Sequence, residues 1–249
     1  APSGLSEACQ HGQVTTPPDA VLGTLSAVPA LSRTDLLAEP VAAALASDAL
    51  EAFVAAIDPG LADTDAFCAH YGVPLDASAN AVVVRGVRGD TERFAVCMTL
   101  ATRRLDVNGA IRKRLDARKA SFAPLEEAVT RTGMEYGGIT PIGRPADWPI
   151  WIDAAVAERP WLCIGSGIRG SKLFVPTATL LRVPGAERVD GLAREIAHEA
   201  VENALHVIQR EFAVGRMRQG AAPGVENLHR LRAGSDLGVQ VVDDGVGRH

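Results

Sequence analysis

The sequence predicts a mixed α+β fold, because stretches with helical periodicity and stretches with strand composition both occur along the chain. Two β-branched or apolar runs, "NAVVVRG" and "RFAVCMTLA", are joined by "VRGD", whose Gly-Asp pair suits a hairpin turn. Around this hairpin, several runs space their apolar residues for helices. With 249 residues and a hydrophobic content of 47%, the chain can bury a full core.

Ahead of the hairpin, the sequence predicts a loose leader followed by two helices. Residues 1–30 are rich in Pro, Ser, Thr and Gly and lack clear periodicity. Residues 35–57 have the apolar spacing of a helix that is broken near Pro40 and ended by Pro59 and Gly60. The segment "DTDAFCAHYG" then predicts a short helix, with Asp63 as N-cap and Gly72 at its end.

After the hairpin, the sequence predicts two helices, a glycine-rich loop and three strands. The run "DVNGAIRKRLDA" reads as a short basic helix capped by Asp106, and "PLEEAVTRTG" as a helix between Pro124 and Gly133. The loop "TGMEYGGITPIG" follows at 132–143, and "PIWIDAAV", "WLCIGSG" and "KLFVPTATLLRV" are typical of strands. From residue 191 onward a long amphipathic helix and a Gly- and Arg-rich tail are expected.

Charge is distributed unevenly along this acidic chain, whose net charge is −5. Residues 1–79 carry ten acidic residues against one arginine, whereas residues 80–119 carry ten basic residues against four acidic ones. Such a basic segment is a candidate contact surface for a phosphate backbone. The alternative, which charge alone favours, is a solvated helix face balanced by the acidic N-terminal segment.

Several other classes of protein are disfavoured by the sequence. No uninterrupted apolar run is long enough to cross a membrane, and no secretory start is present, so we expect a cytoplasmic protein. The four cysteines lie far apart without C-x-x-C spacing and predict buried free thiols. His198, Glu202 and His206 in "HEAVENALH" share one helical face, but a solvated polar face is favoured over a metal site there.

The motif "GSGIRG" at 165–170 satisfies the dinucleotide-binding pattern G-x-G-x-x-G after a strand-like run. That function requires a helix beginning within the motif, so that its N-terminus faces a pyrophosphate. The residues that follow, "SKLFVP", are strand-like and contain a proline, so we do not expect a nucleotide site. Asp153, at the end of another apolar run, either caps the next turn or faces a cleft, and capping is favoured.

Three pieces in order carry a family resemblance. They are the glycine loop "GGITPIG" at 137–143, a hairpin leading into D-x-x-x-[IV]-x-x-x-L at Asp106 to Leu115, and the late glycine turn at 165–170. Together they resemble the YbaK/EbsC family of aminoacyl-tRNA deacylases, the superfamily of editing domains associated with prolyl-tRNA synthetase. The likeness covers roughly residues 65–193, and we expect an editing domain at 61–193 between an N-terminal extension at 1–60 and a C-terminal helix and tail at 194–249.

The resemblance implies a curved, largely antiparallel sheet or partial barrel with flanking helices. It also implies an enzyme that hydrolyses the ester between a wrong amino acid and the terminal adenosine of a tRNA, with backbone amides and a placed water and without cofactor or metal. The catalytic candidates that it implies are Gly137, Gly138, Thr140, Pro141 and Asn80. The substrate-binding candidates are Lys119, Asp153, Gly165, Ser166, Gly167, Arg169 and Lys172.

One departure from the family pattern affects the activity. Family members usually carry a lysine at the start of the first hairpin strand, and the matching position here is Asn80 or Ala81. Another cation, namely Arg85, Lys119 or Lys172, takes the place of that lysine, or the substrate class differs. The remaining alternative is a module that binds tRNA or a small aminoacyl-like ligand without turnover.

Overall fold

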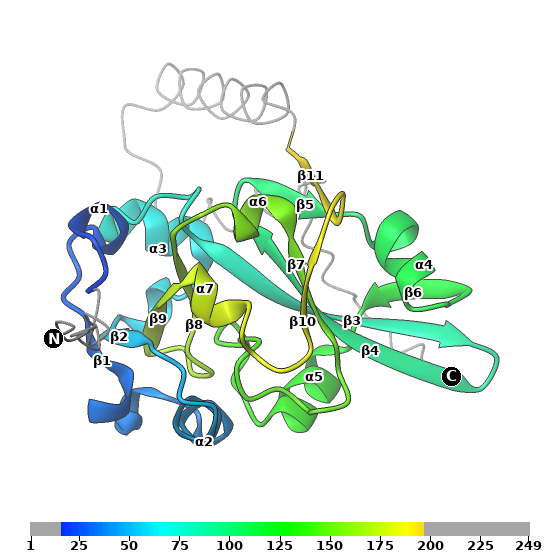
Figure 1. The fold of residues 1–249 in the computed structure, drawn as a ribbon, viewed down its shortest axis with the longest axis horizontal. Helices are drawn as coiled ribbons and strands as arrows, with labels where there is room; N and C mark the ends of the chain where they lie inside the picture. Colours follow the sequence, from blue (N-terminus) through cyan, green and yellow to red (C-terminus); the bar gives the residue numbers. More distant parts are fainter. Residues whose placement is uncertain (1–15, 197–249) are drawn as a thin grey trace, which may run out of the picture. The chain divides into compact units, whose positions relative to one another are not determined.

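Two β-sheets that meet at strands β3 and β8 organise residues 16–196, the part of the chain that this computed structural model describes (Figure 1). The five-stranded sheet has the order β10-β7-β4-β3-β6, with bounds Ala186–Val189, Ile150–Asp153, Thr91–Leu100, Ala79–Arg88 and Lys119–Phe122. The four-stranded sheet has the order β1-β2-β9-β8, with bounds Val28–Pro29, Phe53–Ala56, Ser171–Pro176 and Trp161–Gly165. A small third sheet pairs β5 (Arg103–Leu105) with β11 (Ala193–Glu195).

Short helices flank the sheets. The α-helices are α1 (Asp19–Leu22), α2 (Glu39–Ser47), α3 (Thr64–Tyr71), α4 (Arg112–Arg114), α5 (Leu125–Thr132), α6 (Ala154–Ala157) and α7 (Thr177–Leu180). Single 3₁₀ turns occur at Ala30–Ser32, Thr34–Leu36 and Pro59–Leu61, and a π-helical turn at Val107–Ile111 leads directly into α4.

Strand pairing confirms the predicted mixed α+β fold with mainly antiparallel sheets. The β3–β4 hairpin pairs along its whole length, from Ala79 opposite Leu100 to Arg88 opposite Thr91, and its turn lies at the right of Figure 1. Only β4 with β7 and β7 with β10 are parallel neighbours within the sheets. A single bridge between Ser78 and Cys163 links the two larger sheets, and the strands of residues 16–196 do not close into a barrel.

Three apolar clusters form the core. The largest draws on both larger sheets and on α2 and α5, and it includes the buried side chains of Val41, Met98 and Trp148. A second packs the π-helical turn and α4 against the opposite face of β3 and β4. A third places Phe67 of α3 against Phe174 of β9. Each sheet is therefore covered on both faces, which accounts for near-continuous apolar runs such as "VVV" and "FAVCM".

The helix predicted across residues 35–57 is wrong in its second half. Helix α2 begins at Glu39, with Pro40 in its first turn, and ends at Ser47, whereas residues 53–56 form β2 between β1 and β9. Strand β2 pairs Phe53 with Phe174 and Ala56 with Ser171. The alanine-rich run has helical periodicity, but it takes a strand conformation because β9 offers a ladder of hydrogen bonds and Val54 and Ala55 are buried there.

Three further expectations need correction. The described part of the predicted leader, residues 16–30, contains α1 and β1. The predicted strand at 172–183 ends at Pro176 and continues as α7, and the strand around "PIWIDAAV" turns into α6 after Asp153. Residues 193–195, expected to open a long helix, form β11 because they complete a ladder with β5. For residues 193–195, a strand distant in sequence thus overrides the local helical pattern.

The predicted ends of the other helices are confirmed. Helices α3 and α5 end at Gly72 and Gly133, which both adopt left-handed backbone with φ of 71° and 65°. Asp106 caps the basic helix, since its carboxylate accepts a hydrogen bond from Ala110 N at 3.1 Å. Cys68, Cys97 and Cys163 are free and buried, as predicted.

Some expectations lie outside the described residues. These are Cys9, the HEAVENALH segment, most of the long C-terminal helix and the tail. The division of the chain at residues 60 and 193 stays a prediction, although β2 lies before the first boundary and pairs with β9 beyond it. Across residues 16–196, no helix has both the length and the apolar character needed to cross a membrane.

Replacing the Asp106 cap should destabilise the fold measurably. The Ala110 N–H, and then Arg194 at 2.9 Å, hold the pKa of Asp106 below its usual value. A lowered folded-state pKa means that the stabilisation is present above the unfolded pKa of about 3.9 and is lost as the pH falls through the folded pKa. We expect Asp106→Ala to cost about 1 kcal/mol at pH 7 in urea denaturation, with a smaller difference at pH 3.

Asp106→Asn is the matched control, because its amide oxygen can still cap the helix while the ion pair with Arg194 is lost. It should cost clearly less than the alanine variant at pH 7. Equal losses for the two variants would contradict a capping role for Asp106.

Candidate functional site

The two glycine-rich loops pack against each other, backbone on backbone. Gly167 N donates to Gly138 O at 2.7 Å, and Glu135 N donates to Gly167 O at 2.8 Å. A Cβ atom at Gly165 would lie 2.3 Å from Gly138 O, and one at Gly138 would lie 2.6 Å from the Ile168 carbonyl. Only glycine permits this approach at Gly138 and Gly165, so these two glycines, one from each motif, are explained by one contact.

Arg169 fastens the late glycine turn to the outer part of the 132–143 loop. Its backbone N–H donates to the Glu135 carboxylate at 2.7 Å, and its Nη1 donates to Tyr136 O at 3.2 Å. The guanidinium also lies near the Tyr136 ring, 5.9 Å from the centroid, and pairs with Asp63 at 3.4 Å. The side chain is only partly exposed, so these contacts place a positive charge beside Gly137.

The start of helix α3 gathers three of the predicted site residues. Lys172 Nζ donates to Ala62 O at 2.9 Å, and Asp63 pairs with Arg169. Thr64 Oγ1 donates to Asn80 Oδ1 at 2.7 Å. Asp63 occupies the N-cap position, but its side chain makes no capping hydrogen bond, which leaves the positive end of α3 facing this region.

These contacts define a glycine-loop cluster, which consists of Asn80, Gly137, Gly138, Gly165, Gly167, Arg169 and Lys172. Of the three cations considered as substitutes for the family lysine, only Lys172 lies in it. Its ammonium is buried and 5.1 Å from the Phe67 ring centroid, and burial lowers the pKa of Lys172.

The thiols near Lys172 are not reactive groups. Burial raises the pKa of Cys163 to about 12 and also raises the pKa of Cys68. A thiol with a raised pKa is protonated at neutral pH and is a poor nucleophile. Chemistry in the glycine-loop cluster therefore depends on N–H groups, amide and hydroxyl groups and two cations.

The 132–143 loop has an outward half and a buried half. Gly137 is exposed, with φ of 78°, and its N–H has no hydrogen-bond partner among residues 16–196. By contrast, Gly138 N closes a turn onto Glu135 O at 3.0 Å. Thr140 and Pro141 are buried, and Thr140 Oγ1 has no partner in the described part of the chain. Of the predicted catalytic loop residues, Gly137 is thus the one that a ligand can reach.

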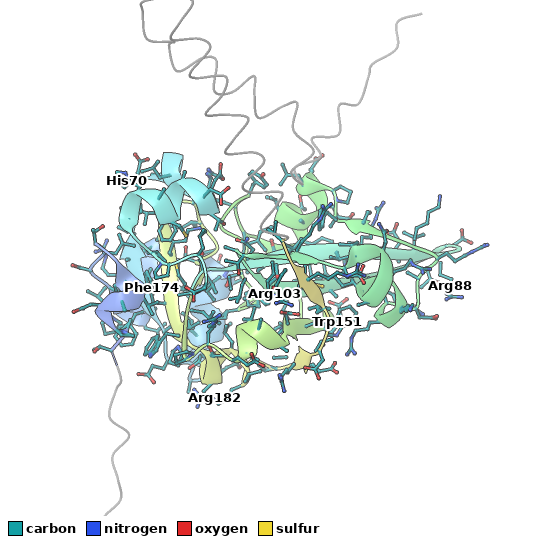
Figure 2. All side chains as sticks on the ribbon, turned by 90° about the horizontal axis from the view of Figure 1, so that it is seen from above. His70, Arg88, Arg103, Trp151, Phe174 and Arg182 are labelled. Atoms are coloured by element: carbon teal, nitrogen blue, oxygen red, sulfur yellow. The ribbon has the colours of Figure 1, made fainter. Side chains whose placement is uncertain are left out.

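Two predicted binding residues have structural contacts. Ser166 is fully buried and shares a 2.7 Å hydrogen bond with Ser171. Asp153 is buried, caps α6 through Ala155 N at 3.2 Å, accepts from Ala193 N at 2.9 Å and pairs with Arg103, which Figure 2 labels. The favoured capping interpretation of Asp153 is confirmed.

Lys119 lies apart from the cluster. It pairs with Val87 near the far end of β3, seven residues along the strand from Asn80. At about 3.3 Å per residue, the two positions are separated by roughly 23 Å. The structure therefore does not bring Lys119 to the glycine loops, and a substrate-binding role for it has to be argued separately.

Sequence reasoning did not single out Asp63, Thr64 and Glu135 as site residues. Asp63 was assigned only as a helix cap, whereas its carboxylate turns to Arg169 instead. Thr64 follows it and meets Asn80 across 16 residues of sequence. The sequence holds no signal for this contact, because no spacing rule links the start of a helix to the first residues of a later strand.

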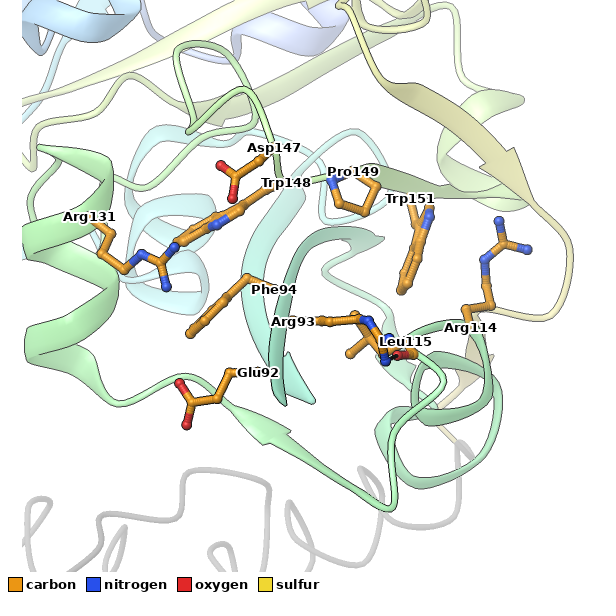
Figure 3. Close-up of a pocket in the computed structure, with 10 residues that line it drawn as sticks. All are labelled: Glu92, Arg93, Phe94, Arg114, Leu115, Arg131, Asp147, Trp148, Pro149 and Trp151. Carbon is orange, nitrogen blue, oxygen red and sulfur yellow. Dashed lines mark hydrogen bonds between the residues drawn. The ribbon is translucent and has the colours of Figure 1, made fainter. Parts of the chain in front are cut away.

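A separate cavity lies where β7 begins beside β4 (Figure 3). Its volume is about 320 Å³. The Arg131 guanidinium lies over Phe94 at 4.2 Å and over Trp148 at 4.9 Å from the ring centroids, and these two rings stack at 5.0 Å. Arg114 lies over Trp151 in the same cavity. Because the aromatic faces are already covered by arginines, we assign these groups to packing.

The described residues contain no group of three or more His, Cys, Asp or Glu side chains placed to hold a metal ion. His70, which Figure 2 labels, lies on α3 with its ring against Tyr71, at a centroid distance of 4.7 Å.

Comparison with models of protein families shows to which family the chain belongs. The model of a family described as the aminoacyl-tRNA editing domain matches residues 58–183, about half of the 249 residues. The chain belongs to the aminoacyl-tRNA editing domain family. The match to the editing domain includes α3, β3 and both glycine loops, so every member of the glycine-loop cluster lies within it.

Solved structures agree with this editing-domain fold. The structure of a candidate trans-editing enzyme for prolyl tRNA synthetase superposes with a TM-score of 0.53 at 22% identity, covering 64% of this chain and 97% of that chain. The hypothetical protein APE2540 superposes with a TM-score of 0.55 at 18% identity, covering 63% of this chain and 100% of that chain. At such identities the likeness concerns the fold.

Adding a methyl group at Gly165 should force the two glycine loops apart. The new Cβ of Gly165→Ala would lie 2.3 Å from Gly138 O and 2.6 Å from Ile139 O, and both are backbone atoms. We expect a loss of about 1–3 kcal/mol in the free energy of unfolding, measured by urea denaturation.

The matched control is Gly170→Ala in the same turn, where the added Cβ would meet only Pro59 Cγ at 3.9 Å. It should change stability by no more than about 0.5 kcal/mol. If both variants were equally stable, the close approach of the loops would not constrain the site.

Proposed function

We propose that this protein is a trans-editing hydrolase, which releases a wrong amino acid from tRNA by cleaving the ester at the terminal adenosine. Membership in the aminoacyl-tRNA editing domain family supports the substrate class. The single structural observation that carries the proposal is the exposed N–H of Gly137, which has no hydrogen-bond partner among residues 16–196 and is held beside the Arg169 guanidinium by the contact between the two glycine loops.

This arrangement suits ester hydrolysis. A water molecule attacks the carbonyl carbon, negative charge develops on the carbonyl oxygen, and the bond to the ribose oxygen then breaks. The hydroxyl of the water stays on the released amino acid, and its proton ends on the ribose oxygen. Fixed N–H donors and a nearby cation stabilise the developing oxyanion without rearranging, which is where such sites gain most of their rate.

The surroundings of Gly137 provide these donors. Its own N–H is unpartnered among the described residues, and Arg169 is fixed by Asp63 and by Tyr136 O. The start of α3 adds the partial positive charge of a helix N-terminus. We place the scissile carbonyl in this region, with Asn80 and Thr64 as the polar side chains available to orient a water or a ribose hydroxyl.

A second function is favoured by one specific observation. The position of the family lysine is taken by Asn80 or Ala81, and the nearby Lys172 ammonium is buried and bonded to Ala62 O. An ammonium held in this way is not free to meet a substrate. The alternative is therefore a module that binds tRNA or a small aminoacyl-like ligand without turning it over.

A panel of mischarged tRNAs tests the proposal directly. Purified full-length protein is incubated with each tRNA, and release of free amino acid is followed over time. We expect at least one member of the panel to be deacylated faster than its spontaneous rate. Saturable binding of the panel with no release from any member would select the non-catalytic alternative.

Substitution of Gly137 tests the assigned site. In Gly137→Val the new side chain begins 2.3 Å from Arg169 Nη1 and so displaces the guanidinium. We expect kcat to fall about 100-fold, because a misplacement of about 1 Å costs that much. Gly89→Val is the control, since Gly89 also has positive φ but has open space around it in the hairpin turn.

Unchanged turnover in Gly137→Val, or an equal loss in Gly89→Val, would remove the loop from the mechanism. If the wild type binds tRNA but does not hydrolyse it, Asn80→Lys should restore measurable release, because it returns a cation to the start of β3. Failure of that variant would show that the missing cation at the start of β3 is not what prevents turnover.

A further inference from the structure

A basic groove runs along the edge strand β6, remote from the glycine-loop cluster. Its volume is about 570 Å³, and the polar side chains that line it belong to Arg85, Asn108, Arg112, Arg118, Lys119 and Ser121. These residues come from β3, β6, the π-helical turn, α4 and, for Arg118, the segment between α4 and β6. Among the described residues, no acidic side chain lines the groove.

The cations of the 80–119 segment divide into two groups. Most arginines pair with carboxylates: Arg88 and Arg93 with Asp116, Arg103 with Asp153, and Arg114 with Glu187. Arg85 is likewise neutralised by Glu92 and Glu127 at 3.5 Å and 3.4 Å. These arginines are therefore balanced by acids, but all of these acids lie outside residues 1–79, so the expected balance by the acidic N-terminal segment is wrong for them.

Three cations of the segment that line the groove are not neutralised in this way. Arg112, Arg118 and Lys119 make no ion pair with any residue of the described range 16–196. Three like charges that share a groove repel one another, and a bound polyanion would relieve that repulsion. Arg104 and Lys113 also lack an ion pair in the described range but do not line the groove, so three of the five unpaired cations of the 80–119 segment share it.

Hydrogen bonds order the Arg112 side chain and the backbone at Arg118 and Lys119. Arg112 Nε donates to Asn108 O at 2.8 Å, which turns its guanidinium along the helix. The backbone N–H of Arg118 donates to Val87 O at 2.9 Å, and Lys119 lies opposite Val87 in the β3–β6 ladder. The backbone that carries these cations is thus ordered before a ligand binds, which lowers the entropy lost on binding phosphates.

We propose that this groove binds the sugar-phosphate backbone of RNA. Its volume of about 570 Å³ and its three cations without an ion pair in the described range suit several successive phosphates better than a single one, and Asn108 and Ser121 can donate to phosphate or sugar oxygens. Resting on the proposed function, the RNA is the tRNA whose ester enters the glycine-loop cluster. The groove and Asn80 lie at opposite ends of β3, roughly 23 Å apart, so one tRNA would contact both through its stem and its 3′ end.

The test uses the full chain and a fluorescent RNA hairpin that reproduces a tRNA acceptor stem. Its dissociation constant is measured by anisotropy at 50 and 200 mM salt for the wild type and for Arg118→Gln/Lys119→Gln. Each phosphate contact contributes about 0.9 to the slope of log affinity against log salt. Loss of two contacts should therefore make the affinity of the variant fall about tenfold less than that of the wild type over this range.

The matched control is Arg104→Gln/Arg182→Gln, which removes the same charge at two exposed residues without ion pairs in the described range, neither of which lines the groove. It should keep the wild-type salt slope. The proposal is overturned if the groove variant also keeps that slope, or if the control loses as much. Because Arg118 and Lys119 are exposed and unpaired, the variant should fold normally, which thermal unfolding checks.

Hydrolysis separates this proposal from the proposed function. If the protein deacylates tRNA, the groove variant should raise KM for aminoacyl-tRNA at low salt about tenfold and leave turnover of an aminoacyl-adenosine unchanged. An equal loss on both substrates would assign the two residues to the ester site and contradict the groove. If no ester is hydrolysed, the proposed function fails, and the anisotropy result still decides whether the groove binds RNA.

Discussion

The close approach of two backbone segments is the constraint on which the candidate site depends. The 132–143 loop and the turn at 165–170 exchange hydrogen bonds through Gly138 and Gly167, at a separation that excludes a Cβ atom. Arg169 follows directly and is therefore held where it reaches Tyr136 and Asp63. Without this contact, the start of α3, the exposed glycine and the cation would be three separate surface features.

Strand β3 connects this site to the rest of the molecule. Its first residues lie beside β8 and carry Asn80, and its last residues pair with β6 at the basic groove. Between these ends, β3 pairs with β4 along its whole length. Helix α3 packs on the four-stranded sheet, and the π-helical turn packs on the five-stranded sheet. The glycine-loop cluster and the basic groove are therefore both attached to β3.

The sequence predicted those elements whose signals are local. The hairpin, the glycine ends of α3 and α5 and the cap at Asp106 follow from turn and capping chemistry, and the structure agrees. Residues 53–56 were predicted wrongly, because an alanine-rich run has helical periodicity whether or not a strand waits to pair with it. The same applies to residues 193–195, whose conformation is set by β5.

The candidate site was only partly predictable for a related reason. Motifs identify glycines, but they do not show which N–H groups remain free, and here Gly138 uses its backbone internally whereas Gly137 does not. Nor did they distinguish Lys119 from Lys172, which lie in different surroundings.

The paired register of β3 also limits how far apart the glycine-loop cluster and the basic groove can lie. Because side chains alternate, an inserted residue would reverse one end of the strand relative to the other, so the distance between the two surfaces can change only in steps of two residues, about 7 Å each. A change of a single residue is therefore expected in the turn of this hairpin and not within β3.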